Sequence, residues 1–298
     1  CNLKECGSPD KTNDKPCFGL CESVETAEII NCSFIKCGYN GNGAAISTQK
    51  VTDILIHNCI FRENIATGIP GDTLSVFIGT GSKNCEISNC HVSTRRSSRI
   101  ENIYQFRVYS ENVIFVNNLF DKYLNEISLT DKGFSGINFN NVVSLTIANN
   151  IFETRNAAVY ATNIQNIDIY NNTWQNLYGA TPAGPPRGLY ISTTLNSLTL
   201  RNNTFARCPN VDNRIMVFDS NEIIIEDCIF IENNFQKNRW GGIGMTFDRT
   251  NFKVIFRNCV FRDNEGIVGG AIQFGGPISP NPNSGSIELY SCRFEGNK

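Results

Sequence analysis

Two aspartates have the residue type and spacing that catalysis would need. Asp219 directly follows a run of β-forming residues that ends at Phe218, and Asp248 follows a similar run that ends at Phe247, with Arg249 next to it. If these runs are equivalent strands of neighbouring repeats, the two carboxylates lie side by side. Such a pair can serve as the acid and base of glycoside hydrolysis, bind calcium or share a proton. Aspartate is also an ordinary turn residue after a strand, so the three residues are weak catalytic candidates.

Histidine is almost absent, because the chain has only His57 and His91. They occupy different positions of neighbouring repeats, which favours two outward-facing strand residues over a shared metal site. A basic cluster at residues 95–99 could contact an acidic glycan, but a solvated loop is the more common role of such a run. We therefore expect no metal site and no cofactor, and cell-surface glycans stay open as partners.

Cysteine is the most unusual feature of the composition, with 13 in 298 residues. Cys1, Cys6, Cys17 and Cys21 fall in a polar segment without an apolar period, which suits a disulfide-stapled cap over residues 1–26. The other nine lie inside a repeat, where a buried thiol packs as a small apolar side chain. So high a cysteine content favours an oxidising compartment, and we expect an extracellular or cell-surface protein.

Net charge and hydropathy argue against two classes of partner. The formal net charge is −2, which gives no positive field to hold nucleic acid or an anionic membrane surface. No apolar run approaches the roughly 20 residues that span a bilayer. With 41% hydrophobic and 18% charged residues, the composition is that of a folded chain with a large core.

One motif recurs along the chain and predicts the architecture. It consists of two apolar residues alternating with polar ones, then Asn, then Cys or Asn, any residue and an aromatic residue. The stretches 54–61 and 254–261 are clear examples. The last position recurs every 22 to 33 residues, at Phe34, Phe61, Val92, Phe120, Phe152, Trp174, Phe205, Phe230, Phe261 and Phe294.

The internal period of the motif is two, which is typical of a β-strand and not of a helix. A second strand-like run follows most of these anchors, for example at residues 74–78, 103–108 and 243–247. Tandem strands at this period, with no helices between them, predict stacked coils. We therefore expect an all-β protein, a right-handed, single-stranded parallel β-helix of about ten coils, over residues 27–298.

Two polar columns should run along such a stack. Equivalent residues of stacked coils lie about 4.8 Å apart, so identical amides can hydrogen-bond along the axis. Asparagine also tolerates the left-handed conformation of a sharp corner. The first column is an expected asparagine ladder of Asn31, Asn58, Asn89, Asn117, Asn149, Asn171, Asn202 and Asn258. The next position is Cys near both ends of the chain and Asn in the middle, as if either could fill one site.

The sequence does not decide which of the two columns faces the core. The question bears on glycosylation, because Asn31, Asn171 and Asn202 each begin an Asn-x-Ser/Thr sequon. An inward column would leave no room for a glycan, whereas an outward column would leave these three sites accessible.

The segment 258–264, Asn-Cys-Val-Phe-Arg-Asp-Asn, is followed by Gly-Gly-Ala-Ile at residues 269–272. This unit resembles the repeat of polymorphic outer-membrane proteins, in which C-x-F-x-x-N and G-G-A-I motifs are paired on right-handed parallel β-helices. Residues 61–64 and 230–233 repeat the F-x-x-N half. The resemblance covers the first two and the last three coils, and it implies a surface-exposed or secreted β-helix with an adhesive role.

Our functional prediction is an extracellular, non-enzymatic structural protein that forms a surface layer or filament. The last anchor, Phe294, is followed by only four residues, with no helix to cover the final coil. Either the protein continues beyond this sequence, or a second copy covers the end by head-to-tail self-association. The alternative is a secreted polysaccharide lyase or glycoside hydrolase of the pectin-lyase-like β-helix type. The N-T-D, G-H-G and R-I-K motifs by which pectin hydrolases of this fold resemble one another do not occur in the sequence.

Overall fold

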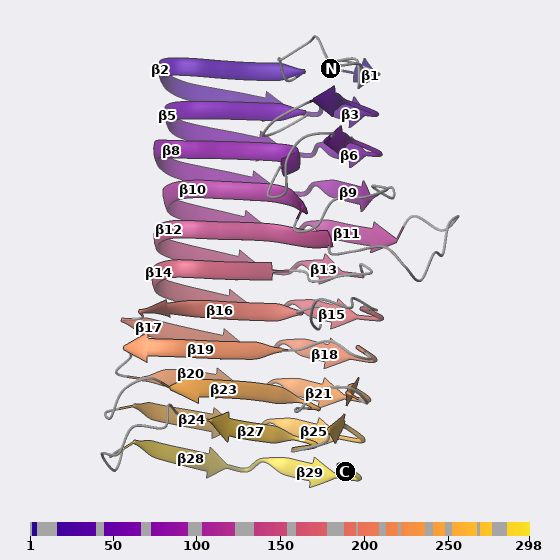
Figure 1. Ribbon diagram of the computed structural model, residues 1–298, viewed down its shortest axis with the longest axis vertical. Coiled ribbons are helices and arrows are strands. Elements are labelled where there is room, and N and C mark those ends of the chain that lie inside the picture. The colour runs from indigo at the N-terminus through magenta and orange to yellow at the C-terminus, as the bar shows by residue number, and fades with distance from the viewer. Residues whose placement is uncertain are drawn as a thin grey trace.

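The computed structural model describes most of the chain, which Figure 1 shows as a ribbon. The described residues are 2–4, 17–39, 45–66, 73–94, 103–122, 134–153, 159–177, 188–194, 196–208, 213–219, 222–235, 241–247, 252–266, 269–275 and 285–298. Asp248 and Arg249, and the expected disulfide cysteines Cys1 and Cys6, lie outside these ranges.

The protein is a parallel β-helix, which confirms the fold predicted from the repeat. Strands of successive coils lie side by side in a sheet of 14 strands and a sheet of 11 strands, and the described pairs are parallel. The 11-stranded sheet takes one strand from each successive coil, close to the expected number of about ten coils. Within the described ranges, no helix has the length and apolarity of a membrane span.

The chain alternates between the two sheets. The 14-stranded sheet begins with six long strands, β2 (Phe18–Ile30), β5 (Ile46–His57), β8 (Thr73–Ser88), β10 (Ile103–Val116), β12 (Phe134–Ala148) and β14 (Val159–Tyr170). The later coils divide the same path into two strands, β16 (Leu189–Thr194) and β17 (Ser197–Arg201), β19 (Arg214–Asp219) and β20 (Ile223–Glu226), β23 (Ile243–Phe247) and β24 (Lys253–Arg257), and β27 (Ile272–Gly275) and β28 (Ser286–Tyr290).

The 11-stranded sheet consists of short strands that carry the anchors. They are β1 (Asn2–Lys4), β3 (Ser33–Ile35), β6 (Ile60–Arg62), β9 (His91–Thr94), β11 (Leu119–Lys122), β13 (Ile151–Phe152), β15 (Thr173–Gln175), β18 (Thr204–Ala206), β21 (Ile229–Ile231), β25 (Val260–Arg262) and β29 (Arg293–Glu295). Two small pairs, β4 (Gly38–Tyr39) with β7 (Ile65–Ala66) and β22 (Asn234–Phe235) with β26 (Glu265–Gly266), follow some of these strands.

The stacked strands begin before residue 27, the start expected from the sequence. β2 starts at Phe18 and pairs with β5, and β1 pairs with β3, so part of the segment 1–26 belongs to the two sheets. Cys17 is half-buried just before β2, and Cys21 lies within β2, where its side chain is not described.

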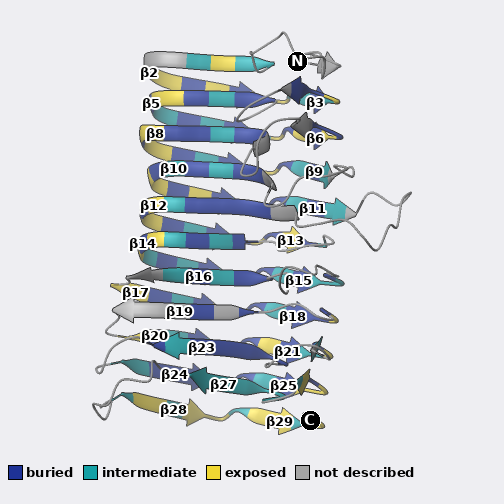
Figure 2. Cartoon of the chain, in the orientation of Figure 1, coloured by how far each residue is buried: buried dark blue, intermediate teal, exposed yellow. Residues whose placement is uncertain are grey.

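Alternating side chains along the strands form the core. In β14, Val159 and Ala161 are buried while Tyr160 and Thr162 between them are half-buried, as the pleat of a strand requires. Figure 2 shows the buried residues running as continuous bands along the strands of successive coils. Most of the aromatic anchors stack face to face: the rings of Trp174 and Phe205 have centroids 4.5 Å apart and planes within 5°. Val92 interrupts the ring column, and the planes of Phe120 and Phe152 are tilted by 31°. Apolar burial therefore acts along the whole axis, and ring stacking along most of it.

The first asparagine column forms the outer side of a sharp corner. All eight asparagines of the expected ladder have a positive φ, and all eight are exposed to solvent. Asn202 Nδ2 donates to Asn171 Oδ1 at 2.8 Å, and Asn171 Nδ2 donates to Asn149 Oδ1 at 3.2 Å. The column is not continuous, because Asn89 Nδ2 contacts His57 Nδ1 at 3.4 Å instead of the amide of the preceding coil. An outward ladder leaves the three sequon asparagines accessible.

The second column is the inward one, and its asparagines are almost completely buried. Asn172 Oδ1 accepts the backbone N–H of Asn150 at 2.9 Å, and Asn172 Nδ2 donates to the carbonyl oxygen of Ile147 at 2.8 Å. Asn118, Asn150 and Asn203 make the same donation to the preceding coil, to Ile87, Phe115 and Ile169 respectively. Each amide thus satisfies backbone groups that the corner leaves without a strand partner.

A cysteine thiol replaces the amide donor at the two ends of this inward column. Cys59 Sγ donates to the carbonyl oxygen of Ile29 at 3.3 Å, and Cys259 Sγ donates to that of Ile225 at 3.4 Å. Ile29 and Ile225 occupy the same position of the repeat as Ile147, which accepts the hydrogen bond from Asn172. Cysteine and asparagine therefore fill one site because both donate a hydrogen bond to the same carbonyl. The nine cysteines of the repeat are free thiols: Cys32, Cys37, Cys59, Cys85, Cys90, Cys208, Cys228, Cys259 and Cys292.

A second corner, after the short strands, repeats the device. There Cys208 N–H donates to Asn233 Oδ1 at 3.2 Å, Asn233 N–H to Asn264 Oδ1 at 3.1 Å, and Asn264 N–H to Asn297 Oδ1 at 3.1 Å. The asparagine of the F-x-x-N motif is thus a buried corner amide.

The Gly-Gly motif also has a steric explanation. A β-carbon on Gly242 would collide with the carbonyl oxygen of Ala271, and one on Gly270 with that of Lys298. Only glycine allows the coils to approach this closely.

Replacing a buried corner amide tests this account of the fold. Asn172→Ala should lower the free energy of unfolding by about 3 kcal/mol, because a backbone N–H and a carbonyl become buried without partners. Asn172→Cys keeps a donor for the Ile147 carbonyl and should lose only about 1 kcal/mol. Urea unfolding followed by circular dichroism measures both, and equal losses in the two variants would contradict the account.

Candidate functional site

The catalytic candidates from the sequence are only partly described. Asp219 is the last residue of β19, where its backbone pairs with Thr194 of β16, and its side chain is not described. Asp248 and Arg249 fall outside the described ranges. The expected carboxylate pair therefore stays a prediction from the sequence.

His57 belongs to a hydrogen-bonded chain on the outer surface of β5 and β8. His57 Nδ1 lies 2.9 Å from Ser88 Oγ, and Ser88 Oγ donates to Glu86 Oε1 at 2.8 Å. Although serine, histidine and glutamate meet here, Ser88 is only 2% exposed and its hydroxyl already donates to Glu86. The arrangement stabilises the sheet surface and offers no accessible nucleophile.

His91 contacts an aspartate that the sequence did not reveal. His91 Nε2 in β9 lies 2.6 Å from Asp121 Oδ2 in β11, and both side chains are partly exposed. One coil further, Asn176 Nδ2 donates to Glu153 Oε1 at 2.8 Å, and Arg207 Nε donates to Asn176 Oδ1 at 3.2 Å. The register pairs His91 with Leu119, so Asp121 is a diagonal neighbour two residues further along β11. These groups form a polar string on an open sheet face and line no described cleft.

A shallow groove of about 380 Å³ lies across the second halves of β2, β5, β8 and β10. Its polar rim includes Glu28, Asp53, Asn84, Glu86 and Asn112. Asn84 Nδ2 donates to Asp53 Oδ1 at 2.7 Å, and Asn112 Nδ2 donates to Asn84 Oδ1 at 3.0 Å. The rim groups therefore bond to one another along the axis. Among the side chains that the structure describes, no three His, Cys, Asp or Glu form a group that could hold a metal ion.

Burial changes the acidity of the repeat thiols. Desolvation raises the pKa of Cys85 and of Cys208 to about 12. Cys59 and Cys90 interact as neighbours in the inward column, and this interaction raises the pKa of Cys90 and lowers that of Cys59 to about 7. Cys85, Cys90 and Cys208 therefore stay protonated at neutral pH and lack the ionised form that a nucleophile requires.

The last coil differs from the others in exposing residues of the core columns. Ile287 is 40% exposed and Leu289 is 50% exposed, whereas Val254 and Phe256, their partners in β24, are fully buried. Figure 2 shows this change from buried to exposed between β24 and β28. The last coil thus presents the same kinds of side chain that bury one another everywhere else in the stack.

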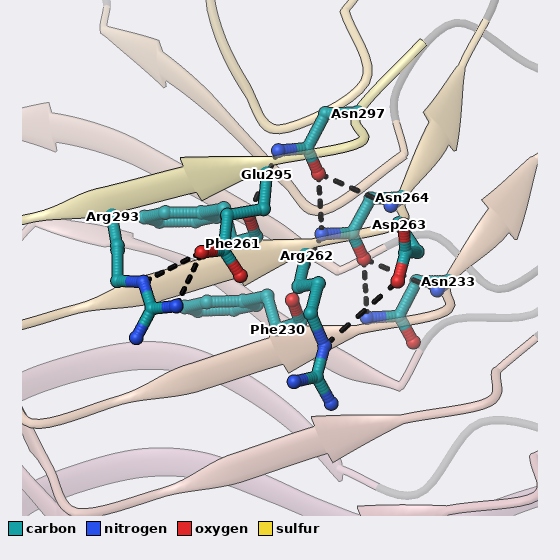
Figure 3. Close-up of polar contacts among 9 residues, drawn as sticks. All are labelled: Phe230, Asn233, Phe261, Arg262, Asp263, Asn264, Arg293, Glu295 and Asn297. Atoms are coloured by element: carbon teal, nitrogen blue, oxygen red, sulfur yellow. Dashed lines mark hydrogen bonds and ion pairs between the residues drawn. The ribbon is translucent and has the colours of Figure 1, made fainter.

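The column of aromatic rings and the column of buried asparagines at the second corner also continue into the last coil. The rings of Phe261 and Phe294 stack 5.0 Å apart, yet Phe294 is 47% exposed because its other face is open. Beside them, Asn297 Nδ2 donates to the carbonyl oxygen of Phe261 at 2.8 Å, like the asparagines before it. Figure 3 shows the ring column and the amide column next to each other. This face, with the backbone edges of β27, β28 and β29, is the candidate functional site, and we call it the terminal face.

Comparison with known proteins agrees with the architecture. A family model described as a right-handed β-helix region matches residues 133–298, which is more than half of the chain. No curated protein and no solved structure matches the chain.

The raised thiol pKa values predict a loss of stability at alkaline pH. An unfolded thiol ionises near pH 8.5, whereas Cys85 in the folded protein keeps its proton until about pH 12. The stabilisation from the protonated form is complete below pH 8.5 and decreases as the pH rises toward 12. Cys85→Val removes this contribution, and valine suits the position because Cys85 pairs with Val113.

Urea unfolding at pH 8 and pH 10 measures the effect. From pH 8 to pH 10 the free energy of unfolding of the wild-type protein should fall by about 2 kcal/mol more than that of Cys85→Val. The same pH dependence in both proteins would show that Cys85 ionises equally well in the folded state.

Proposed function

The chain belongs to the right-handed β-helix family, and we propose that it is an extracellular, non-enzymatic structural protein that assembles head to tail. The proposal is supported by three columns that continue into the last described coil, where Leu289, Phe294 and Asn297 hold the places of Phe256, Phe261 and Asn264 in the coil before it. A coil of a second copy could pair with the same ladder, rings and amides that join coils inside the molecule.

The first coil supplies a matching register for a second copy. β1 pairs with β3 so that Leu3 lies in the column of Phe34 and Lys4 in the next column. If β29 of one copy pairs with β1 of the next in this register, Phe294 meets Leu3 and Glu295 meets Lys4. The register thus pairs an apolar residue type with an apolar one, and an acidic residue type with a basic one. A heterologous contact of this kind propagates into a filament.

Two features support an extracellular location. The N-terminal segment holds Cys1, Cys6, Cys17 and Cys21, and clustered cysteines suit disulfides in an oxidising compartment. The other nine cysteines are weaker evidence for an oxidising compartment than the sequence alone suggested, because their packing at the corners and in the core accounts for them. The resemblance to polymorphic outer-membrane repeats also favours a surface location, with adhesion to cell-surface glycans as an additional role.

The exposed polar groups favour a structural role over an enzymatic one. His91 with Asp121 and the rim of the groove bond to neighbouring coils, on open sheet faces. For a lyase or hydrolase the catalytic candidates are Asp219, Asp248 and Arg249, and turnover of acidic polysaccharides with or without calcium would favour that alternative.

Substitutions with matched exposure test head-to-tail assembly. Ile287 on the terminal face and Ile229 on the side of the stack are both 40% exposed. Ile287→Asp should weaken self-association more than tenfold, because assembly would bury the new carboxylate without a partner. Ile229→Asp should leave self-association unchanged. Sedimentation velocity over a range of concentrations measures both variants.

Electron microscopy of the wild-type chain provides the second measurement, and it should show unbranched rods longer than one molecule. A wild-type chain that stays monomeric at high concentration would contradict the proposal. Equal weakening by Ile287→Asp and Ile229→Asp would place the contact on the sides of the stack.

A further inference from the structure

We propose that Asn171 and Asn202 are sites of N-linked glycosylation, on adjacent coils at the outer corner of the stack. The proposal rests on the extracellular location proposed above, and it adds a covalent modification that assembly does not require. Asn171-Asn172-Thr173 and Asn202-Asn203-Thr204 both fit the sequon.

Both asparagines meet the first requirement for a folded glycoprotein, which is space for the sugar. Asn171 and Asn202 are exposed, and each stands at a left-handed corner, with φ of 56° and 51°. Their immediate neighbours Asn172 and Asn203 are at most 1% exposed and point into the core. The alternation at the corner thus places the glycosylated residue of each sequon outside and the middle residue inside.

The outer amide ladder leaves a hydrogen free for the sugar. A primary amide has two N–H donors. These ladder contacts run in one direction, from Asn202 Nδ2 to Asn171 Oδ1 at 2.8 Å and from Asn171 Nδ2 to Asn149 Oδ1 at 3.2 Å. Each contact uses one N–H of the donor amide. The other N–H can be replaced by a sugar carbon while the ladder contact is kept.

The two sequon threonines fit the fold as well. Thr173 in β15 pairs with Thr204 in β18, and both are half-buried on the outer surface of the 11-stranded sheet. Neither hydroxyl is needed by the core, so the threonines can be changed without disturbing the columns.

The modification is a glycosyl transfer from a polyprenyl-diphosphate oligosaccharide. The amide Nδ2 forms a bond to the anomeric carbon of the first sugar, and the bond from that carbon to the diphosphate oxygen breaks. The amide loses one proton, and the lipid diphosphate leaves as the other product. The folded protein must accommodate the product.

The position of the glycans also agrees with head-to-tail assembly. The corner that carries Asn171 and Asn202 runs along the side of the stack, between the long strands and the short strands (Figure 1). Sugars there project laterally and leave the terminal face uncovered. The same arrangement would oppose lateral aggregation of the exposed sheet faces.

Secretion of the full chain from eukaryotic cells tests the proposal. A cleavable signal peptide directs the chain into the secretory route, and a second secreted glycoprotein from the same cells confirms that transfer is active. Peptide mass spectrometry before and after treatment with peptide N-glycosidase should find glycans on Asn171 and on Asn202. Unmodified peptides at both positions in the secreted chain would overturn the proposal, whether or not the chain forms filaments.

Three variants test separately whether glycosylation needs the sequon and whether the exposed corner position accepts a glycan. Thr173→Val and Thr204→Val should each remove one glycan while the ladder asparagine stays in place, and thermal unfolding checks that each variant is folded. Ile151→Thr creates a new sequon at Asn149, which has the same corner conformation and exposure. We expect a glycan there too. Glycosylation of Asn149 alone would show that the neighbouring sites are blocked and would overturn the proposal for Asn171 and Asn202.

Discussion

The structure depends on hydrogen bonds made by one buried side chain at each corner. A left-handed residue turns the chain sharply and takes backbone groups away from the strand ladders, yet the next residue lies inside the core. Asn150 and Asn172 satisfy the groups that this leaves, by accepting an N–H from one neighbouring coil or donating to a carbonyl. Because each bond joins adjacent coils, it also holds them in register. The aromatic stack and the apolar columns follow from that register.

The sequence predicts the coil period, the anchor column and the two polar columns, because each depends on spacing alone. It could not decide which polar column is buried. At a left-handed corner the strict alternation of a strand is broken, so the exposed Asn171 and the buried Asn172 have the same residue type and look equivalent. The high cysteine content was ambiguous too, because it fits either disulfides in an oxidising compartment or a structural role for free thiols. Cys59 and Cys259 have the structural role, since they donate corner hydrogen bonds and are free thiols.

The contacts between columns were harder to predict than the columns themselves. His91 reaches Asp121 diagonally, two residues beyond its register partner, and only the relative position of two coils determines such a contact. The only sequence signal was that both residues flank an anchor, His91 before Val92 and Asp121 after Phe120. β2 begins at Phe18, ahead of residue 27, and no aromatic anchor precedes it in the sequence to mark that coil.

Hydrogen exchange at the corners tests the central claim most directly. The backbone N–H groups of Asn118, Asn150 and Asn172 lie outside the strands, and each donates to the side-chain oxygen of the next coil's asparagine at 2.8, 2.9 and 3.0 Å. The account predicts that these three N–H groups exchange only when the whole protein unfolds, as slowly as the strand N–H groups beside them. Exchange at the rate of an open loop, with the strands still protected, would show that the corner amides do not hold the coils together.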